Sequence, residues 1–161
     1  MDINQQIQRL IDKAPPDGTG VLIEQVIGPV LRAFAAQVEH LEYYVMQSLT
    51  QEWVLTTLSN RAQPQQQKKV IYAFATLKDA RQFQETPDPS LMAVCLPVTH
   101  ILFQLLAMEP VDSVVFMDVP KNLSQGKEVK RQDLQNLVKS QMEQVKPSPG
   151  AGSRPIPPDF A

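Results

Sequence analysis

The chain has 161 residues, of which 43% are hydrophobic and 20% are charged, and its formal net charge is -2. This length suits about one domain with a substantial core, and the composition excludes a fibrous protein and disorder of the whole chain. The charged residues form no basic stripe. Nucleic acid is therefore a disfavoured partner, because a phosphate backbone needs clustered cations.

The chain shows no signal for a membrane or for secretion. No apolar run approaches the ~20 residues of a membrane span. The start Met1-Asp2-Ile3-Asn4 has neither the basic residues nor the apolar block of a secretory signal. Cys95 is the single cysteine, which excludes an internal disulfide and favours a reducing compartment. We therefore expect a cytoplasmic protein without a membrane span.

Residues 1–42 are expected to form a helical N-terminal extension. Apolar residues recur at helical spacing near the start, at Ile3, Ile7, Leu10 and Ile11. A run with prolines and glycines at 14–20 ends this first helix. A wide apolar stripe follows over 23–41, and it either packs on the rest of the chain or forms a homodimer face. Within it, Pro29 should kink or break the helix, or occupy the first turn of a second helix.

The period changes after residue 42, where β-branched and aromatic residues become frequent. Residues 43–49 and 53–58 are separated by a short polar link, which predicts a hairpin. Residues 60–69 read as a polar loop, and 70–75 as a third strand. Short links favour neighbouring strands, so the simplest arrangement is an antiparallel meander of three strands.

The rest of the chain alternates short strands and helices. Thr76 and Asp79 predict the start of a helix that reaches residue 83. We then expect a short strand or an extended run at 91–96, a helix beginning near Pro97, a strand at 113–119, a polar loop at 122–127 and a helix from 134 to 145. Residues 147–161 contain five prolines and no apolar period, which predicts a disordered or polyproline-like tail.

Candidate catalytic groups are few. Cys95 and His100 lie five residues apart and would suit a thiol and its base, but the apolar run around Cys95 favours a buried, inert cysteine. Two histidines and one cysteine make a poor metal set. The carboxylates Asp79, Asp112 and Asp118 suit caps and turns better than acid–base chemistry. We therefore predict no catalytic residue, no metal and no cofactor.

Binding of another protein or peptide segment is the alternative to catalysis. A groove between sheet and helices is the expected site, lined by Trp53, Tyr72, Phe74 and Leu102. In the tail, Ile156 and Phe160 would anchor a polyproline-type contact, unless the terminus is simply unstructured.

The order of elements over 43–145 resembles the N-terminal domain of the SseB-like family. The strand pair at 44–47 and 53–58 comes first, and the junction 73–80 looks like the family's strand-to-helix junction. The helix after Pro97 and the strand at 113–119 follow in the family's order. Gly126-Lys127-Glu128-Val129 precedes the last helix as Gly-Lys-Glu-Leu does in the family. The likeness covers about two-thirds of the chain.

The chain also departs from the family. Asp118-Val119-Pro120 stands where Asn-Pro-Gly is frequent, and Lys130 stands near a helix start that usually carries Thr or Ser. The helices of 1–42 and the Pro-rich tail are additions, and the family's second domain is absent.

The resemblance implies an α/β (α+β) fold, with a single mixed sheet packed by helices in a domain at 43–146. It also implies a non-enzymatic adaptor, assembly factor or chaperone-like module. The Gln-rich, Pro-tailed style is typical of cyanobacterial proteins, which makes a photosynthetic or carbon-fixing (carboxysome-type) complex a candidate partner. The alternatives are a regulatory domain that binds a small metabolite in the same groove and, less favoured, a Cys95-dependent enzyme.

Overall fold

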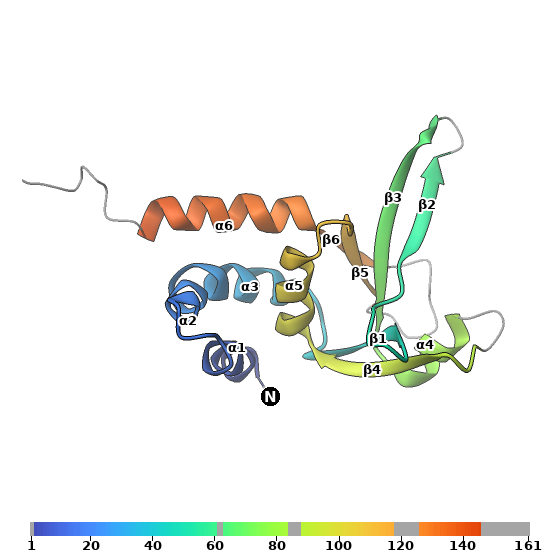
Figure 1. Cartoon of the computed structure of the whole chain (residues 1–161), viewed down its shortest axis with the longest axis horizontal. Helices are drawn as coiled ribbons and strands as arrows, with labels where there is room; N and C mark the ends of the chain where they lie inside the picture. Colours follow the sequence, from blue (N-terminus) through green and yellow to red (C-terminus); the bar gives the residue numbers. More distant parts are fainter. Residues whose placement is uncertain (1, 61–62, 84–87, 118–125, 146–161) are drawn as a thin grey trace, which may run out of the picture.

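A six-stranded mixed sheet with helices on both faces forms the centre of the fold (Figure 1). The computed structural model describes residues 2–60, 63–83, 88–117 and 126–145. The strands are β1 (Glu42–Ser48), β2 (Thr56–Asn60), β3 (Gln63–Phe74), β4 (Leu91–Pro97), β5 (Ser113–Met117) and β6 (Lys127–Lys130). The helices are α1 (Ile3–Asp12), α2 (Thr19–Leu22), the π-helical segment η1 (Ile23–Ile27), α3 (Gly28–Ala35), α4 (Leu77–Phe83), α5 (Val98–Ala107) and α6 (Arg131–Val145).

The strand order is β4-β1-β3-β5-β6, with β2 paired to β3 outside this path. β3 and β5 run parallel, and all other pairs are antiparallel. The chain needs a long crossover between the parallel strands, and α4, β4 and α5 supply it. The expected single mixed sheet is thus confirmed.

The expected three-strand meander is wrong. After the turn at 50–52, Trp53 forms only an isolated bridge with Gln47, and β2 then pairs with the first half of β3. β1 pairs with the last residues of β3 on the same edge, through Tyr44 opposite Phe74 and Val45 opposite Ala73. β1 and β2 therefore lie one after the other along β3, because β3 is long enough to offer a partner to each.

The predicted polar loop at 60–69 is also wrong for residues 63–69, which are the first half of β3. With β2 they form a two-stranded arm that extends away from the rest of the sheet (Figure 1). Leu58 is 42% exposed, and Gln67 and Lys69 are also exposed. A polar sequence forms strands here because β2 and β3 satisfy each other's backbone hydrogen-bonding groups, so neither strand needs an apolar face packed on a core.

Several other expectations concern the ends of elements. Thr76 caps α4 as predicted, since its Oγ1 accepts from the amide of Asp79 (3.1 Å). Pro97 lies one residue before α5, in extended conformation. Lys127, expected in a loop, begins β6, whose four residues pair antiparallel with β5. Residues 118–125, including Asp118, and the tail at 147–161 lie outside the described residues.

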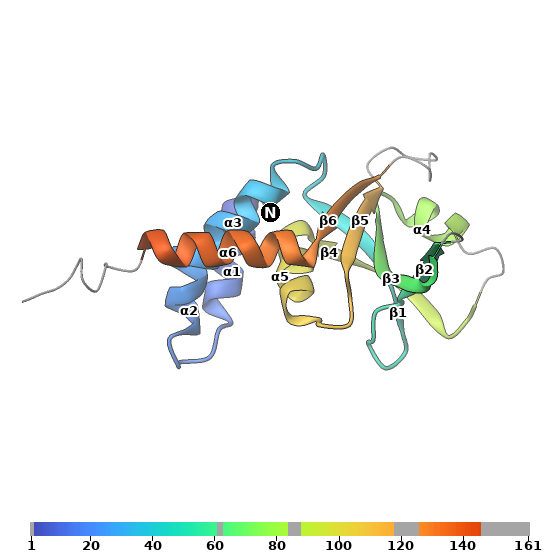
Figure 2. The same cartoon turned by 90° about the horizontal axis from the view of Figure 1, so that it is seen from above.

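The two faces of the sheet carry separate apolar clusters, as the alternation of strand side chains requires. On β3, Ile71 and Ala73 belong to the large cluster that includes α3 and α5, whereas Phe74 joins a smaller cluster with Ala80 of α4. β1 and β5 divide their residues in the same way. Figure 2 shows α1, α3, α5 and α6 gathered on the other side of the sheet from α4.

The helical run at 19–35 continues through the Gly28-Pro29 position by a π-helical segment. Pro29 lies in the first turn of α3, and the amide of Gly28 bonds back to the carbonyl of Ile23. A Cβ at residue 28 would lie 2.7 Å from that carbonyl oxygen, so glycine is required there. Pro29 has no N–H to offer the carbonyl of Gln25, and the side chain of Gln141 in α6 donates to it instead (3.3 Å).

The apolar stripe on η1 and α3 packs inside the chain. Ile23, Leu31 and Phe34 are buried, and α3 lies against α5 and α6. The large cluster contains residues from both sides of the boundary expected at 42/43. The helices of 1–42 therefore share the core of the sheet, and the stripe leaves little surface for the homodimer considered above. The helix predicted to reach residue 41 ends at Ala35.

A buried polar junction fixes α1 to the beginning of α5. The side chain of Gln6 is fully buried; its Nε2 donates to the carbonyl of Leu41 (2.9 Å). Its Oε1 accepts from the amide (3.1 Å) and the hydroxyl (2.8 Å) of Thr99. The amide of Val98 also donates to Leu41 (2.9 Å). This junction joins the start of β1 to the end of β4, so that both strands are held at that end.

Candidate functional site

β4 is an edge strand of the sheet, and its character sets it apart from the other edges. Its seven residues pair with β1 along their whole length, and within the described parts of the chain no strand pairs with its other side. Residues 91–97 carry no charge. β6, the edge at the opposite side of the sheet, is short and contains two lysines and a glutamate. Charge and shortness protect β6 against addition of a further strand, whereas β4 has only Pro97 at its end.

The two sides of β4 differ because successive residues turn their backbone groups in opposite directions. The amide of Val54 donates to the carbonyl of Met46 (2.9 Å), on the side of β1 away from β4. Odd-numbered residues of β1 therefore bond to β4, and their partners, such as Val94, use their N–H and C=O groups inward. Ala93 and Cys95 consequently turn their N–H and C=O groups toward the open side.

The ends of the strand contribute less to this open side. The amide of Leu91 already donates to the carbonyl of Asp88 (3.1 Å), and Pro97 has no N–H. The donors available for a further strand are therefore those of Ala93 and Cys95. Two residues that each offer a donor and an acceptor match the four main-chain bonds of a short antiparallel ladder.

The side chains of β4 are apolar and partly exposed. Met92 is 47% exposed, and Val94 and Leu96 on the same face are half-buried. On the α4 face, Ala93 is half-buried and Cys95 is exposed. The strand thus combines open backbone groups with uncharged side chains on both faces.

The expectation that Cys95 is buried is wrong, because the alternation of an edge strand leaves it exposed beside Tyr44 of β1. Partial burial and the negative charge of Glu42 raise the pKa of the Cys95 thiol, against a hydrogen bond with Tyr44 that lowers it. A raised pKa leaves less thiolate at neutral pH, which disfavours a nucleophilic role. The Nε2 atom of His100 lies 3.1 Å from the backbone carbonyl oxygen of Gln6, so the hydrogen bond of this ring belongs to the buried junction around Gln6 and not to a pair with Cys95.

The four groove residues predicted from the sequence do not lie together. Trp53 and Leu102 belong to the cluster on the α5 face, and Tyr72 and Phe74 to the cluster on the α4 face. Leu102 and Phe74 are each 1% exposed, so they present almost no surface to a partner. Tyr72 packs against Phe83, with ring centroids 4.6 Å apart. The sheet itself separates the two pairs, since alternate residues of a strand face opposite sides.

The two remaining predicted partner-binding residues, Ile156 and Phe160, lie outside the described residues. Trp53 is the predicted residue that reaches a surface hollow. This hollow has a volume of about 370 Å³ and is formed by the turn after β1 and the end of α5, with Gln51, Glu52, Trp53, Leu55, Gln104, Met108 and Pro110 as its lining. Its shallow, mixed surface offers no convergent set of polar groups for chemistry.

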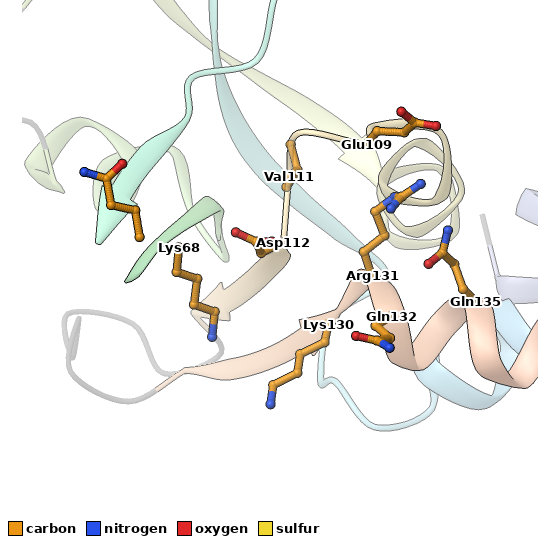
Figure 3. A pocket seen from close by; sticks show the side chains of 9 residues that line it. Lys68, Glu109, Val111, Asp112, Lys130, Arg131, Gln132 and Gln135 are labelled. Carbon is orange, nitrogen blue, oxygen red and sulfur yellow. The ribbon is translucent and has the colours of Figure 1, made fainter. Parts of the chain in front are cut away.

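A second hollow, of about 400 Å³, lies where β3, β6 and α6 meet the turn before β5 (Figure 3). Lys68, Lys130 and Arg131 contribute positive charge, and Glu109 and Asp112 contribute negative charge. The mixture of signs disfavours a site for a strongly charged ligand.

Hydrogen bonds within the protein already engage most of these groups. Lys68 pairs with the carboxylate of Glu128, which also accepts from the hydroxyl of Ser113 (2.6 Å). The Nε of Arg131 donates to the carbonyl of Leu106 at the end of α5 (3.3 Å). Asp112 accepts from the amide of Lys69 (2.7 Å). These bonds join β3, β5, β6 and α5, so the hollow is best explained as a polar junction that supports the sheet.

The described residues contain no group of three or more His, Cys, Asp or Glu side chains that would hold a metal ion. No helix within the described ranges has both the length and the apolar character needed to cross a membrane. The open edge of β4 is the candidate site that sequence reasoning missed. Its signal was the lack of charge over 91–97, which we interpreted only as a sign of burial.

No protein-family model matches this chain, and no curated protein matches its sequence. The resemblance to the SseB-like family therefore stays a prediction, and the functional argument depends on the geometry of the chain itself.

Proposed function

We propose that this chain is a non-enzymatic, cytoplasmic protein-binding module of the adaptor or assembly-factor kind. It receives an extended segment of another protein as an additional strand along the outer side of β4. The observation that carries this proposal is the open, uncharged edge of β4, with Ala93 and Cys95 turning their backbone groups outward. In a reducing cytoplasm Cys95 stays a thiol and does not block that edge.

Strand addition accounts for both affinity and selectivity. Main-chain hydrogen bonds contribute about 1 kcal/mol each, so four of them supply a moderate share of the affinity. The side chains of Met92, Val94 and Leu96 then select the partner through the face that alternate residues share. The preferred segment is extended, free of proline at its bonding positions, and apolar at every second residue.

The identity of the partner is a further part of the proposal. The succession of strands, short helix, strand, helix and strand follows the order of elements that the SseB-like hypothesis expects, and that hypothesis implies a role in protein interaction. A photosynthetic or carbon-fixing complex remains the proposed setting. The alternatives receive less support, because Lys68 at the larger of the two hollows is already paired with Glu128 and because Cys95 has a raised pKa.

Selection from a phage-displayed library of random peptides tests the proposal without knowledge of the natural partner. The protein is presented as wild type, with counter-selection on Ala93→Pro. Proline at residue 93 removes an outward N–H while keeping the inward bonds of Met92 and Val94. We expect selected peptides with alternating apolar residues. These peptides should bind the wild type at least roughly tenfold more tightly than Ala93→Pro, which corresponds to a loss of about 1.4 kcal/mol of binding free energy in the variant.

A matched control separates the edge from general surface effects. Leu58→Lys changes an exposed apolar residue on the β2–β3 arm and should leave peptide affinity unchanged. Hydrogen exchange of the amides of Ala93 and Cys95 should slow when a selected peptide binds. Peptides that bind Ala93→Pro as tightly as the wild type, or a selection that yields no edge-dependent peptide, would refute strand addition at β4.

A further inference from the structure

We propose that, when no partner is present, the open edge of β4 pairs with β4 of a second copy of this chain. The two strands run antiparallel about a two-fold axis, and one sheet then continues through both copies. This inference rests on the edge that carries the proposed function, and it names the occupant that competes with a partner segment. Binding of a partner therefore requires the two copies to separate.

Charge favours this occupant. In a two-fold antiparallel pair the strand faces an identical copy of itself that runs the other way. Charged residues of one copy can therefore lie opposite residues of the same charge in the other copy, which repels the two strands. Residues 91–97 carry no charge and meet no such penalty. β6 provides the contrast, because full overlap of two copies would place Lys127 opposite Lys130 twice. Of these two edges of the sheet, β4 is the one whose sequence is compatible with itself.

The outward hydrogen-bonding groups of β4 also favour pairing with a second copy. Full overlap of residues 91–97 places Val94 opposite Val94 of the second copy, and Ala93 opposite Cys95 of the second copy. Ala93 and Cys95 are the residues whose N–H and C=O groups turn outward, so this register makes them hydrogen-bonded pairs. The two symmetric pairs form four main-chain bonds, and none of them needs the amide of Leu91 or a donor from Pro97.

The same register buries apolar surface. Met92, which is 47% exposed, lies opposite Leu96 of the second copy, and the two half-buried Val94 side chains meet at the axis. On the other face, the small side chains of Ala93 and Cys95 lie opposite each other. Figure 1 shows β4 on the side of the sheet away from α6 and β6, so these elements do not stand between the two strands.

Cys95 allows a direct distance measurement, because it is the single cysteine of the chain. In the full-overlap register the two Cys95 residues are diagonal neighbours on one face, about 7–8 Å apart. This separation exceeds the usual span of a disulfide but suits a short bis-maleimide or a pair of spin labels.

The experiment measures the mass of the full chain by sedimentation over a range of concentrations, together with cross-linking at Cys95. We expect a transition from 18.1 kDa to twice that mass, and a cross-linked dimer formed by a bis-maleimide with a spacer of about 8 Å. Ala93→Pro and Met92→Lys should each remain monomeric and lose the cross-link. Leu58→Lys should behave as the wild type. Circular dichroism confirms the folding of each variant, and Met92→Lys is the fold-safe choice because Met92 is already half exposed.

The outcomes separate the two proposals. A wild-type chain that is monomeric at every concentration, or a dimer that both variants retain, overturns the self-pairing. If edge-dependent peptides are still selected in that case, strand addition by a partner stands. A dimer that is lost in both variants, with no edge-dependent peptide, supports self-pairing and overturns the proposed function. Where both hold, a selected peptide should convert the dimer to monomers.

Discussion

Two sets of polar groups lie close together, one along the outer side of β4 and one just beyond the end of that strand, and they are satisfied in opposite ways. At the end of the strand, the buried side chain of Gln6 bonds to the carbonyl of Leu41 and to the amide and hydroxyl of Thr99. Along the outer side, Ala93 and Cys95 turn their groups away from the sheet. The side chain of Gln6, distant in sequence, thus satisfies the hydrogen-bonding groups of Leu41 and Thr99, whereas the outward groups of Ala93 and Cys95 stay available to solvent or to another strand.

This difference separates stability from binding. Buried polar groups must be hydrogen-bonded, because each one left without a bond costs about 1–3 kcal/mol. Solvent-facing groups bond to water and cost little. Changes at the junction or on the inner side of β4 should therefore lower the free energy of unfolding, whereas changes on its outer side should alter association.

The largest effect should come from moving a proline by one residue along β4. Val94→Pro removes an inward N–H and places a ring against β1, and it should lower the free energy of unfolding by roughly 3 kcal/mol or more. Ala93→Pro removes an outward N–H and should cost less than about 1 kcal/mol. Urea denaturation of both variants gives the two values. Equal losses would show that the inner and outer sides of β4 are not distinct, contrary to the alternation inferred from the bonds of β1.

The junction provides the next largest effect. Gln6→Leu keeps the volume but removes one donor and one acceptor, and should lower the free energy of unfolding by about 2–3 kcal/mol because the groups of Thr99 lose their partner. Gln8→Leu on the exposed side of α1 removes only a surface bond to Asp12 and should cost less than about 0.5 kcal/mol. A similar loss in both variants would mean that α1 is held by its helix propensity and not by the junction.

The sequence predicts most of the elements and little of their pairing. Helices α1, α5 and α6 follow from apolar residues at helical spacing, and β1, β4 and β5 follow from apolar runs. Pairing depends on contacts between distant residues, so the sharing of β3 by β1 and β2 has no local signal. β6 and the polar half of β3 were missed because their stability comes from backbone bonds to a neighbour and not from an apolar face.

The candidate site shows the same limit. The apolar run around Cys95 is compatible with a buried strand and with an edge strand, and only the strand order decides between them. The predicted groove failed for a related reason, since Tyr72 and Phe74 lie on one face of the sheet and Trp53 on the other. Strand alternation would have placed Tyr72 and Phe74 together, but the face that α5 covers cannot be read from local sequence.

The opposite edge of the sheet provides a smaller test. Burial tends to raise the pKa of Glu128, but hydrogen bonds from Lys68 and Ser113 and the charges of Lys68 and Lys130 outweigh it, so the pKa lies below its usual range. The ionised form is therefore stabilising above the unfolded pKa, and this contribution is lost as the pH falls through the folded pKa. Glu128→Gln should lower the free energy of unfolding by at most about 1 kcal/mol at neutral pH, because the pair is partly exposed. In acid, the free energy of unfolding of the variant should approach that of the wild type. Association through β4 should not change at any pH.

The smallest effect concerns the one titrating group of the closed junction. Burial lowers the pKa of His100, as do the charges of Lys13, directly after α1, and of Arg9 on α1, and these effects outweigh the bond to the carbonyl of Gln6. Between the lowered folded pKa and the unfolded value of about 6.5, the unfolded chain binds more protons, so stability falls as the pH drops through that window. His100→Gln keeps a neutral donor but has no group that titrates in this range. It should therefore flatten the pH dependence of the free energy of unfolding between neutral pH and the lowered pKa. Urea denaturation across this range measures both slopes. If the wild type and His100→Gln lose stability in parallel, acid acts elsewhere, and the junction is closed by Gln6 and Thr99 without help from His100.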